Sequence, residues 1–169
     1  MEEVQLESLA ADHAVGLWKN VIIGMWRKTP RVKGVKECSE LAERAHKKFP
    51  KGTVVFLIIA ERPTPPPSSD ARQIFAKMMT SYNGVTRCTA VVAEGGSLSV
   101  SVVRGVLTSL LILARHDTPT KMFGKVGEAA TWLRQELANA QAPVFDTVEL
   151  DAAVNSLRAR MDAEERASV

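Results

Sequence analysis

The run TVVFLIIA at residues 53–60 constrains the fold of this chain more than any other feature. Its apolar residues follow one another without polar alternation, which is typical of a strand covered on both faces of a sheet. A second strand-like run, VTRCTAVVAE at residues 85–94, follows a helical pattern. Strands that alternate with helices in this way predict an α/β fold with a mainly parallel sheet and right-handed crossovers.

Two shorter apolar runs precede the first buried strand. Val15–Trp18 and Val21–Trp26 are separated by Lys19-Asn20, a two-residue break that suits a tight hairpin. The acidic residues 1–12 are predicted to be a loosely ordered lead-in.

Helical patterns alternate with the predicted strands. One precedes Pro50, and others cover about residues 69–82, 98–115 and 125–140. The first and the last of these place apolar side chains on one face and charged ones on the other, as surface helices do. Their expected core residues are Val35, Cys38, Ala42, Ala45, Phe49, Val126, Ala129, Ala130, Leu133 and Leu137.

A short edge strand is predicted at residues 117–124, because Pro119 is compatible with an edge or with a strand start. The predicted order is therefore β-β-α-β-α-β-α-β-α over residues 13–140. This is one α/β domain with a mainly parallel or mixed sheet flanked by helices.

Residues 141–169 are predicted to form a C-terminal amphipathic helix after the break at Pro143. Asp146 with Glu149 three residues later is typical of a helix start. The apolar residues of this helix form a narrow seam, which consists of Leu150, Val154, Leu157 and Met161. A helix with such a seam can dock on its own domain, pair with a second subunit or partner, or remain mobile.

The charge balance of the 169 residues is mild, with 22 basic and 19 acidic side chains and a net charge of +3. This balance does not predict a nucleic-acid partner. Basic residues are concentrated in one stretch, which is interpreted as a solvated face, with an acidic partner or a phosphate surface as the alternative. They are Arg27, Lys28, Arg31, Lys33 and Lys36.

The cysteines, Cys38 and Cys88, lie in a helical and a strand-like pattern, where they are expected to be buried thiols of a reducing compartment. No spacing predicts a metal site, and no cofactor is expected. The N-terminus lacks a secretory signal and no apolar run is judged long enough for a membrane span, so a cytoplasmic location is expected.

The ordered set of elements resembles the STAS superfamily, the sulfate-transporter and anti-sigma-factor-antagonist fold, in its divergent bacterial branch grouped with SEC14-like domains. The resemblance covers roughly residues 13–138. It is carried by the hairpin ending at Trp26, by VVFLIIA with PPPSSDAR, by VVAEGGSLSVSVVRGVLTSLLILAR and by MFGKVGEAATWL. It implies a non-enzymatic regulatory protein that acts through protein–protein contacts in bacterial signalling.

The resemblance also implies a regulatory serine or threonine at the start of one helix, where phosphorylation controls partner binding. The corresponding segment is Pro65–Arg72. The usual Asp-Ser-Ser or Asp-Ser-Thr followed by glycine is replaced there by three prolines and Ser68-Ser69-Asp70-Ala71.

The residues of this segment suit a helix start in their own right. Ser68 or Ser69 can accept a hydrogen bond from an otherwise unpaired N–H, and Asp70 complements the positive end of the helix dipole. A phosphate at the same place would make a switch. The proline loop, residues 63–67, and Arg72 are candidate partner contacts.

The AEGGSLS stretch resembles a nucleophile elbow, with Ser97 in the position of the nucleophile. Ser99 replaces the second glycine, and a base is missing. The histidines are His13, expected before the hairpin; His46, expected on an outer helix face; and His116, about 25 Å from Ser97 along a helix. A serine hydrolase is therefore a remote alternative. Gly95, Gly96, Ser97 and Ser99 otherwise form a turn and cap, or an anion or nucleotide loop.

The helix over about 98–115 is expected to bury a broad stripe formed by Val102, Val103, Val106, Leu107, Leu110 and Leu113. Its other side carries small residues, at Ser101, Gly105 and Ser109. This side is either solvated or a partner or homodimer interface, with Arg104, Thr108 and Ile112 beside it. An alternative function is a binding module for a small apolar or anionic ligand, such as a lipid or nucleotide, between this helix and the sheet.

Overall fold

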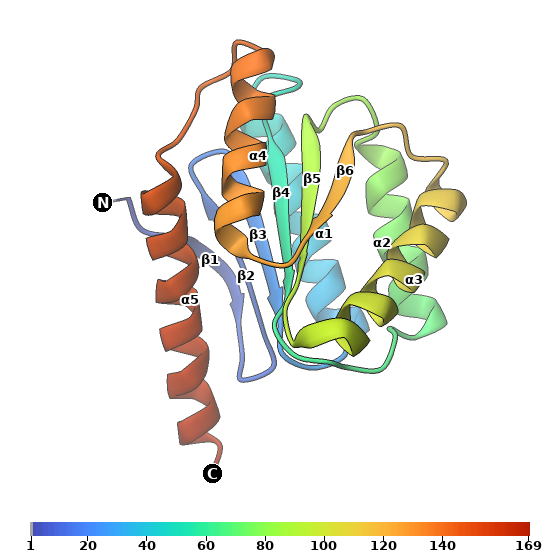
Figure 1. Cartoon of the computed structure of the whole chain (residues 1–169), viewed down its shortest axis with the longest axis vertical. Helices are drawn as coiled ribbons and strands as arrows, with labels where there is room; N and C mark the ends of the chain where they lie inside the picture. The colour runs from blue at the N-terminus through green and yellow to red at the C-terminus, as the bar shows by residue number, and fades with distance from the viewer. Residues whose placement is uncertain (1) are drawn as a thin grey trace.

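The computed structural model describes residues 2–169, which form a six-stranded sheet with helices on both faces (Figure 1). The strands follow one another across the sheet in chain order. The first three strands are antiparallel and the later ones parallel, so the predicted α/β fold with a mixed sheet is confirmed. They are β1 (Gln5–Leu9), β2 (His13–Trp18), β3 (Val21–Trp26), β4 (Val55–Ala60), β5 (Cys88–Ala93) and β6 (Thr120–Phe123).

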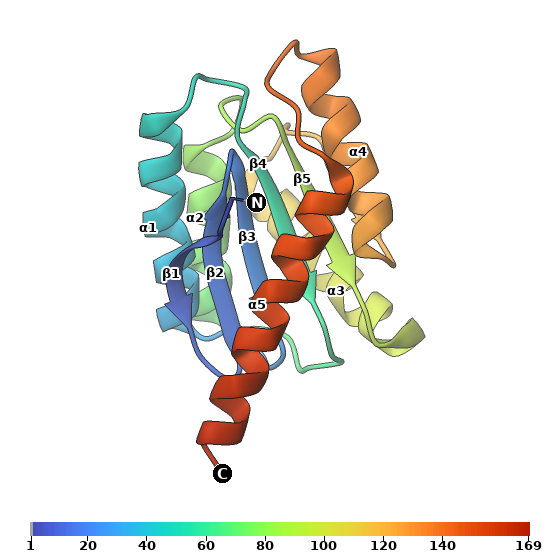
Figure 2. The same cartoon turned by 90° about the vertical axis from the view of Figure 1, so that its left-hand side faces the viewer.

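The helices divide between the two faces of the sheet. The first three lie on one face and the last two cover the other (Figure 2). They are α1 (Val32–Lys48), α2 (Ser69–Ser81), α3 (Gly96–Ala114), α4 (Val126–Asn139) and α5 (Thr147–Ala167).

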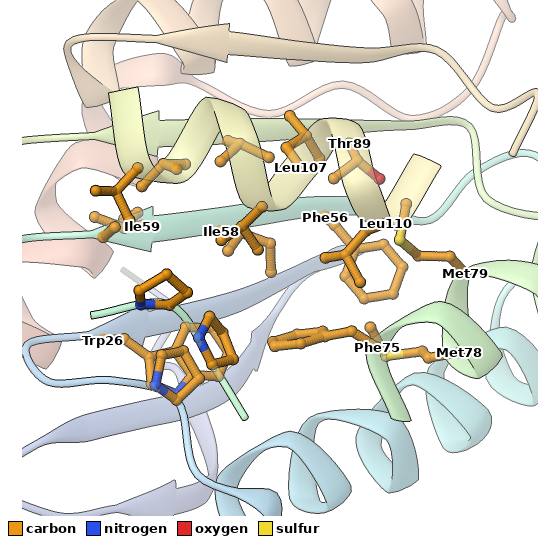
Figure 3. A pocket seen from close by; sticks show the side chains of 18 of the residues that line it. Trp26, Phe56, Ile58, Ile59, Phe75, Met78, Met79, Thr89, Leu107 and Leu110 are labelled. Carbon is orange, nitrogen blue, oxygen red and sulfur yellow. The ribbon is translucent and has the colours of Figure 1, made fainter. Parts of the chain in front are cut away.

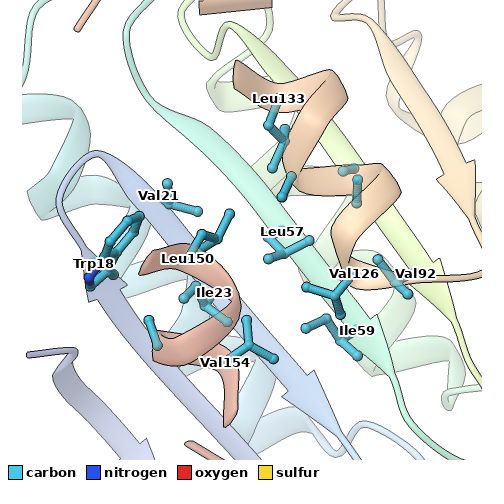
Figure 4. Packing of buried hydrophobic residues seen from close by; sticks show 14 of the residues in the cluster. Trp18, Val21, Ile23, Leu57, Ile59, Val92, Val126, Leu133, Leu150 and Val154 are labelled. Carbon is cyan, nitrogen blue, oxygen red and sulfur yellow. The ribbon is translucent and has the colours of Figure 1, made fainter. Parts of the chain in front are cut away.

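The continuous apolar run of β4 is explained by its central position between β3 and β5. Leu57 and Ile59 pack toward α4 and α5, whereas Phe56 belongs to the core on the side of α1 and α2. Figure 4 shows Leu57 and Ile59 beside Val126 and Leu133 of α4. Both faces of this strand therefore need a helical cover.

The prediction of a loosely ordered lead-in is wrong for residues 5–9, which form the edge strand β1 against β2. Val4 is buried, and the Trp18 indole Nε1–H donates to the Glu2 carbonyl at 3.0 Å. Gly16 makes the close approach possible, because an added Cβ would lie 2.5 Å from Val4 Cγ1. The acidic charge of this segment obscured its alternation of apolar and polar residues.

Helix α5 docks on its own domain, which selects one of the three predicted arrangements. Its seam residues Leu150, Val154, Leu157 and Met161 are fully buried in the core shared with α4. As predicted, Asp146 caps the helix: its carboxylate accepts from the Val148 N–H at 2.7 Å.

Arg27 departs from the predicted solvated basic face. Its side chain is 6% exposed, and it pairs with Glu61 at 2.6 Å and with Asp162 of α5 at 2.7 Å. The rest of the cluster remains exposed, as predicted. Arg27 differs because it directly follows β3, where the end of α5 covers it.

We expect Leu157→Ala to lower the free energy of unfolding by about 2–5 kcal/mol, because it leaves a cavity in a packed core. Val148→Ala, on the exposed side of the same helix, is the control and should change it by less than about 0.5 kcal/mol. Urea unfolding at two protein concentrations measures both. A midpoint that rises with concentration would contradict docking within one chain.

Candidate functional site: an apolar cavity beneath α3

A cavity of about 140 Å³ lies between the sheet, α2, α3 and the proline loop (Figure 3). Its floor includes Phe56 and Ile58 of β4, and α2 contributes Phe75 and Met79. Ile58 remains half-exposed although it lies in the middle of a central strand. The cavity is therefore a gap in the cover of an apolar sheet face.

The cavity exists because α3 does not bury its predicted apolar stripe. Of that stripe, Leu110 is buried, whereas Leu113 is 59% exposed. Val102, Val103, Val106 and Leu107 are half-exposed and line the cavity instead of entering a packed core. The predicted core stripe is thus wrong, because helical periodicity does not show how closely a helix approaches its sheet.

Two glycines set where α3 begins. Gly95 and Gly96 have φ of 92° and 86°, a left-handed conformation that favours glycine. A Cβ on Gly95 would lie 2.7 Å from Pro63 Cδ. The glycine pair therefore allows the chain to turn from β5 beside the proline loop and to carry α3 across the cavity.

Helix α3 also corrects the expectation about apolar length. Among the described residues, it is the one helix long and apolar enough to cross a membrane by length and composition. Only 17% of an 18-residue stretch of this helix is buried in the fold. Most residues of α3 are therefore not packed in a core.

The start of α2 forms the rim of the cavity. Thr64 to Pro67 line it, and the Pro65 carbonyl accepts a hydrogen bond from the Thr29 hydroxyl at 2.9 Å. Ser68 is the N-cap, because its hydroxyl oxygen accepts from the Ala71 N–H at 3.2 Å. This confirms the capping interpretation for Ser68, and Ser69 and Asp70 are exposed beside it.

The predicted ligand loop is not assembled as one group. Ser97 is exposed, whereas Ser99 is buried and its hydroxyl has no hydrogen-bond partner within residues 2–169. Gly95 and Gly96 serve the turn. His116 follows the opposite end of α3, so the chain places it at the other end of the helix from Ser97.

The small-residue side of α3 faces outward, with Ser101, Arg104, Gly105 and Thr108 exposed and Ile112 74% exposed. A Cβ added to Gly105 would meet no atom of the described chain within 4 Å. A close approach within this chain therefore does not explain the glycine. The assignment of this side to a partner remains a prediction.

His46 corrects the expectation of an outer-face histidine. Its ring stacks on Tyr82 at 4.1 Å, its Nδ1–H donates to the Ala42 carbonyl, and its Nε2 accepts from the Thr86 hydroxyl. Burial lowers the pKa of His46, and the Ala42 carbonyl opposes this shift. His46 is a neutral support behind the cavity wall.

A Ser–His–Asp grouping that sequence spacing did not indicate occurs at the far edge of the sheet. Ser8 Oγ lies 2.9 Å from His13 Nε2, and Asp12 Oδ1 lies 2.9 Å from His13 Nδ1. Glu37 Oε2 also faces Nε2, at 3.3 Å. His13 Nε2 is thus shared between the Ser8 hydroxyl and the Glu37 carboxylate and is not reserved for the serine. The group ties β1 and β2 to α1 through these contacts.

The carboxylates at the strand ends are neutralised by α5. Arg158 Nε pairs with Glu61 at 2.7 Å, and its Nη2 pairs with Glu94 at 2.8 Å. Glu94 is therefore engaged in holding α5, and Asp70 lies in the first turn of α2. The structure gives these two carboxylates separate structural roles.

Comparison with known proteins identifies the fold. No family model and no curated protein matches the sequence. The structure is similar to the crystal structure of an uncharacterized DUF3478-family protein with a SpoIIAA-like fold from Shewanella loihica PV-4. The TM-score is 0.53 with 13% sequence identity, over 79% of this chain and 95% of the other. SpoIIAA-like is the STAS fold, so the predicted STAS-like fold is confirmed.

We expect Ser68→Ala to lower the free energy of unfolding by about 1 kcal/mol, because the Ala71 N–H loses its acceptor. Ser69→Ala removes the same atoms one residue later and should change it by less than about 0.5 kcal/mol. Chemical denaturation compares the two variants. Equal losses would contradict the assignment of the cap to Ser68.

Stability should fall as the pH drops below 6.5. Burial lowers the pKa of His46 and of His116 from the ordinary value of 6.5, so protonation favours the unfolded chain. The contribution of these two neutral histidines to the free energy of unfolding is fully present above pH 6.5, and it is lost as the pH falls through their lowered pKa values. The slope of unfolding free energy between pH 7 and 5 measures it, and His46→Gln should reduce that slope. An unchanged slope would contradict a buried neutral His46.

Proposed function

We propose that this chain is a non-enzymatic STAS-like regulatory module that binds a small apolar molecule in the cavity beneath α3. The SpoIIAA-like fold supports the regulatory class. The cavity supports the ligand and carries the proposal, since its walls are built almost wholly from apolar side chains. The alternative raised by the sequence, a ligand held between the sheet and the GGSLS helix, is thus the function that the geometry favours.

The size of the cavity indicates a ligand as small as a single ring with a short chain. An engineered apolar cavity of about 150 Å³ stays dry and binds benzene, and the volume here is about 140 Å³. A ligand that removes its own apolar surface and that of the cavity walls from water would gain free energy from this burial.

The chemistry of the walls supports binding rather than catalysis. Within residues 2–169, the side chains lining the cavity include no carboxylate and no thiol. The Thr86 hydroxyl on the wall is already bonded to His46. The other histidine near these walls, His116, lines the cavity itself, and neither of its ring nitrogens is hydrogen-bonded to a hydroxyl of the described chain, so no nucleophile is paired with a base there.

Regulation would reach a protein partner through α3, because one helix forms both the cavity wall and an exposed apolar surface. Val106 lines the cavity, whereas Leu98, Ile112 and Leu113 are exposed on the same helix. A ligand that changes the position of α3 changes the surface that a partner or a second copy meets. We place this interaction in the bacterial cytoplasm, with the proline loop and Arg72 as further contacts.

We expect Val106→Trp to weaken binding of n-butylbenzene by at least about tenfold, because the indole occupies the cavity. A tenfold loss of affinity corresponds to about 1.4 kcal/mol of binding free energy. A phenyl ring that is displaced from its pocket by the indole should lose more than this. Ile112→Trp adds the same group to the outer side of α3 and should leave this binding unchanged. Isothermal titration calorimetry compares the variants with the wild type. Equal affinity of the wild type and Val106→Trp for n-butylbenzene would contradict a ligand site in this cavity.

A further inference from the structure

The indole N–H of Trp26 is a buried donor without an acceptor. Trp26 lines the cavity and is 4% exposed, and its Nε1 has no hydrogen-bond partner among residues 2–169. Trp18, on the opposite face of the sheet, donates its Nε1–H to the Glu2 carbonyl at 3.0 Å. Leaving a buried donor unpaired costs about 1–3 kcal/mol. The buried donor of Trp26 is therefore the unusual one of this pair.

The Trp26 ring is held in place by its neighbours. A Cβ on Gly24 would lie 2.5 Å from Trp26 Cζ3 and 2.7 Å from Cη2, so the six-membered ring fits over that glycine. Phe75 packs edge-on against the indole, with ring centroids 5.8 Å apart. The indole ring therefore has a defined place in the cavity wall, with its N–H buried.

A second polar group lies at the other end of the cavity. Both His116 ring nitrogens are buried and make no hydrogen bond of good geometry in the described chain, although the Met79 backbone lies near the ring. Burial lowers the pKa of His116, and the Met79 backbone and the Asp117 charge oppose this shift. Thr89 also lines the cavity. Its N–H donates to the carbonyl of Pro119, which follows His116 by three residues, so we assign Thr89 to the same end.

The two ends are separated by most of a strand. Trp26 pairs with Ala60 of β4, and Thr89 pairs with Phe56. These β4 positions are four residues apart, or about 13 Å at about 3.3 Å per residue. Figure 3 shows Trp26 toward one end and Met79 toward the other. An elongated ligand fits this shape better than a round one.

The described cavity lining has no charged side chain that could pair with an acid or an amine. Of the residues that line the cavity, His116 is the one that titrates near neutrality, and the described lining includes no lysine, arginine, aspartate or glutamate. An ionised group would be desolvated without a partner, which is costly. An indole N–H is a donor only, so its ligand must offer an acceptor.

We propose that the cavity takes a neutral, elongated apolar molecule with a carbonyl oxygen, such as a ketone, an aldehyde or an ester, and that this oxygen accepts from Trp26 Nε1–H. The inference rests on the proposed function, because it names the ligand class of the same cavity. Shape and burial come from the apolar walls, and we assign the selectivity for the carbonyl oxygen to the Trp26 donor.

Three probes of matched size test this inference by isothermal titration calorimetry at pH 7.5: n-butylbenzene, 4-phenyl-2-butanone and 3-phenylpropanoate. We expect the ketone to bind about 3- to 10-fold tighter than the hydrocarbon, the range of one hydrogen bond. The carboxylate should bind at least about tenfold more weakly than the ketone. Trp26→Phe should abolish the preference for the ketone, and Trp18→Phe, the matched control, should retain it.

A measurement on the wild-type protein covers the case in which Trp26→Phe does not fold. The ketone should move the Trp26 indole N–H proton resonance downfield, and n-butylbenzene should not produce that shift. Equal affinity for ketone and hydrocarbon without such a shift would overturn the carbonyl inference and leave the cavity intact. Tightest binding of the carboxylate would overturn neutrality, and failure of all three probes to bind would overturn the proposed function itself.

Discussion

The need to cover both faces of the central parallel strands governs the rest of this structure. β4 is apolar along its whole length, so water must be excluded from both of its sides. On one side α4 and α5 meet this need, and Leu57, Leu133 and Leu157 are fully buried there. On the other side α1 and α2 cover part of the face, and α3 stands off from the remainder. The cavity results from this difference between the two sides.

The position of α5 depends on charge as well as on apolar contact. Arg27 and Arg158 share Glu61, with Arg27 Nε 2.6 Å and Arg158 Nε 2.7 Å from its carboxylate oxygens. Buried charges are costly unless they are paired, so these contacts favour one register of the helix on the sheet. Apolar surface holds α5 against the sheet, and the shared carboxylate fixes where along the sheet it sits.

The cavity and the outer face of α3 are two sides of one element, which gives the proposed function a physical basis. Val103 and Val106 face the ligand space, while Ile112 is turned to solvent. In the proposed function, a partner on the outer face and a ligand on the inner face would be thermodynamically linked when each binds one position of α3 more tightly than another.

Local patterns in the sequence determined the layers of the fold. Consecutive apolar residues predicted β4, the Lys19-Asn20 break predicted the hairpin, and Ser68 and Asp146 predicted two helix starts. These features depend on neighbours in the chain, so the sequence displays them directly. The same patterns placed β1 in a loose segment and the stripe of α3 in a packed core, because pairing at an edge and distance from a sheet do not appear in periodicity.

The tertiary structure alone decided the site. Trp26, His116 and Ile58 are far apart in the chain, and no spacing relates them. Arg27 looks like its solvated neighbours in sequence, yet it is buried by a helix that begins 120 residues later. The sequence by itself determined which segments are strands and helices, since hydrogen bonding and side-chain period are local. Only the folded chain decided where the apolar cover ends and where, within residues 2–169, an indole N–H is left without a partner, because both depend on how distant segments meet.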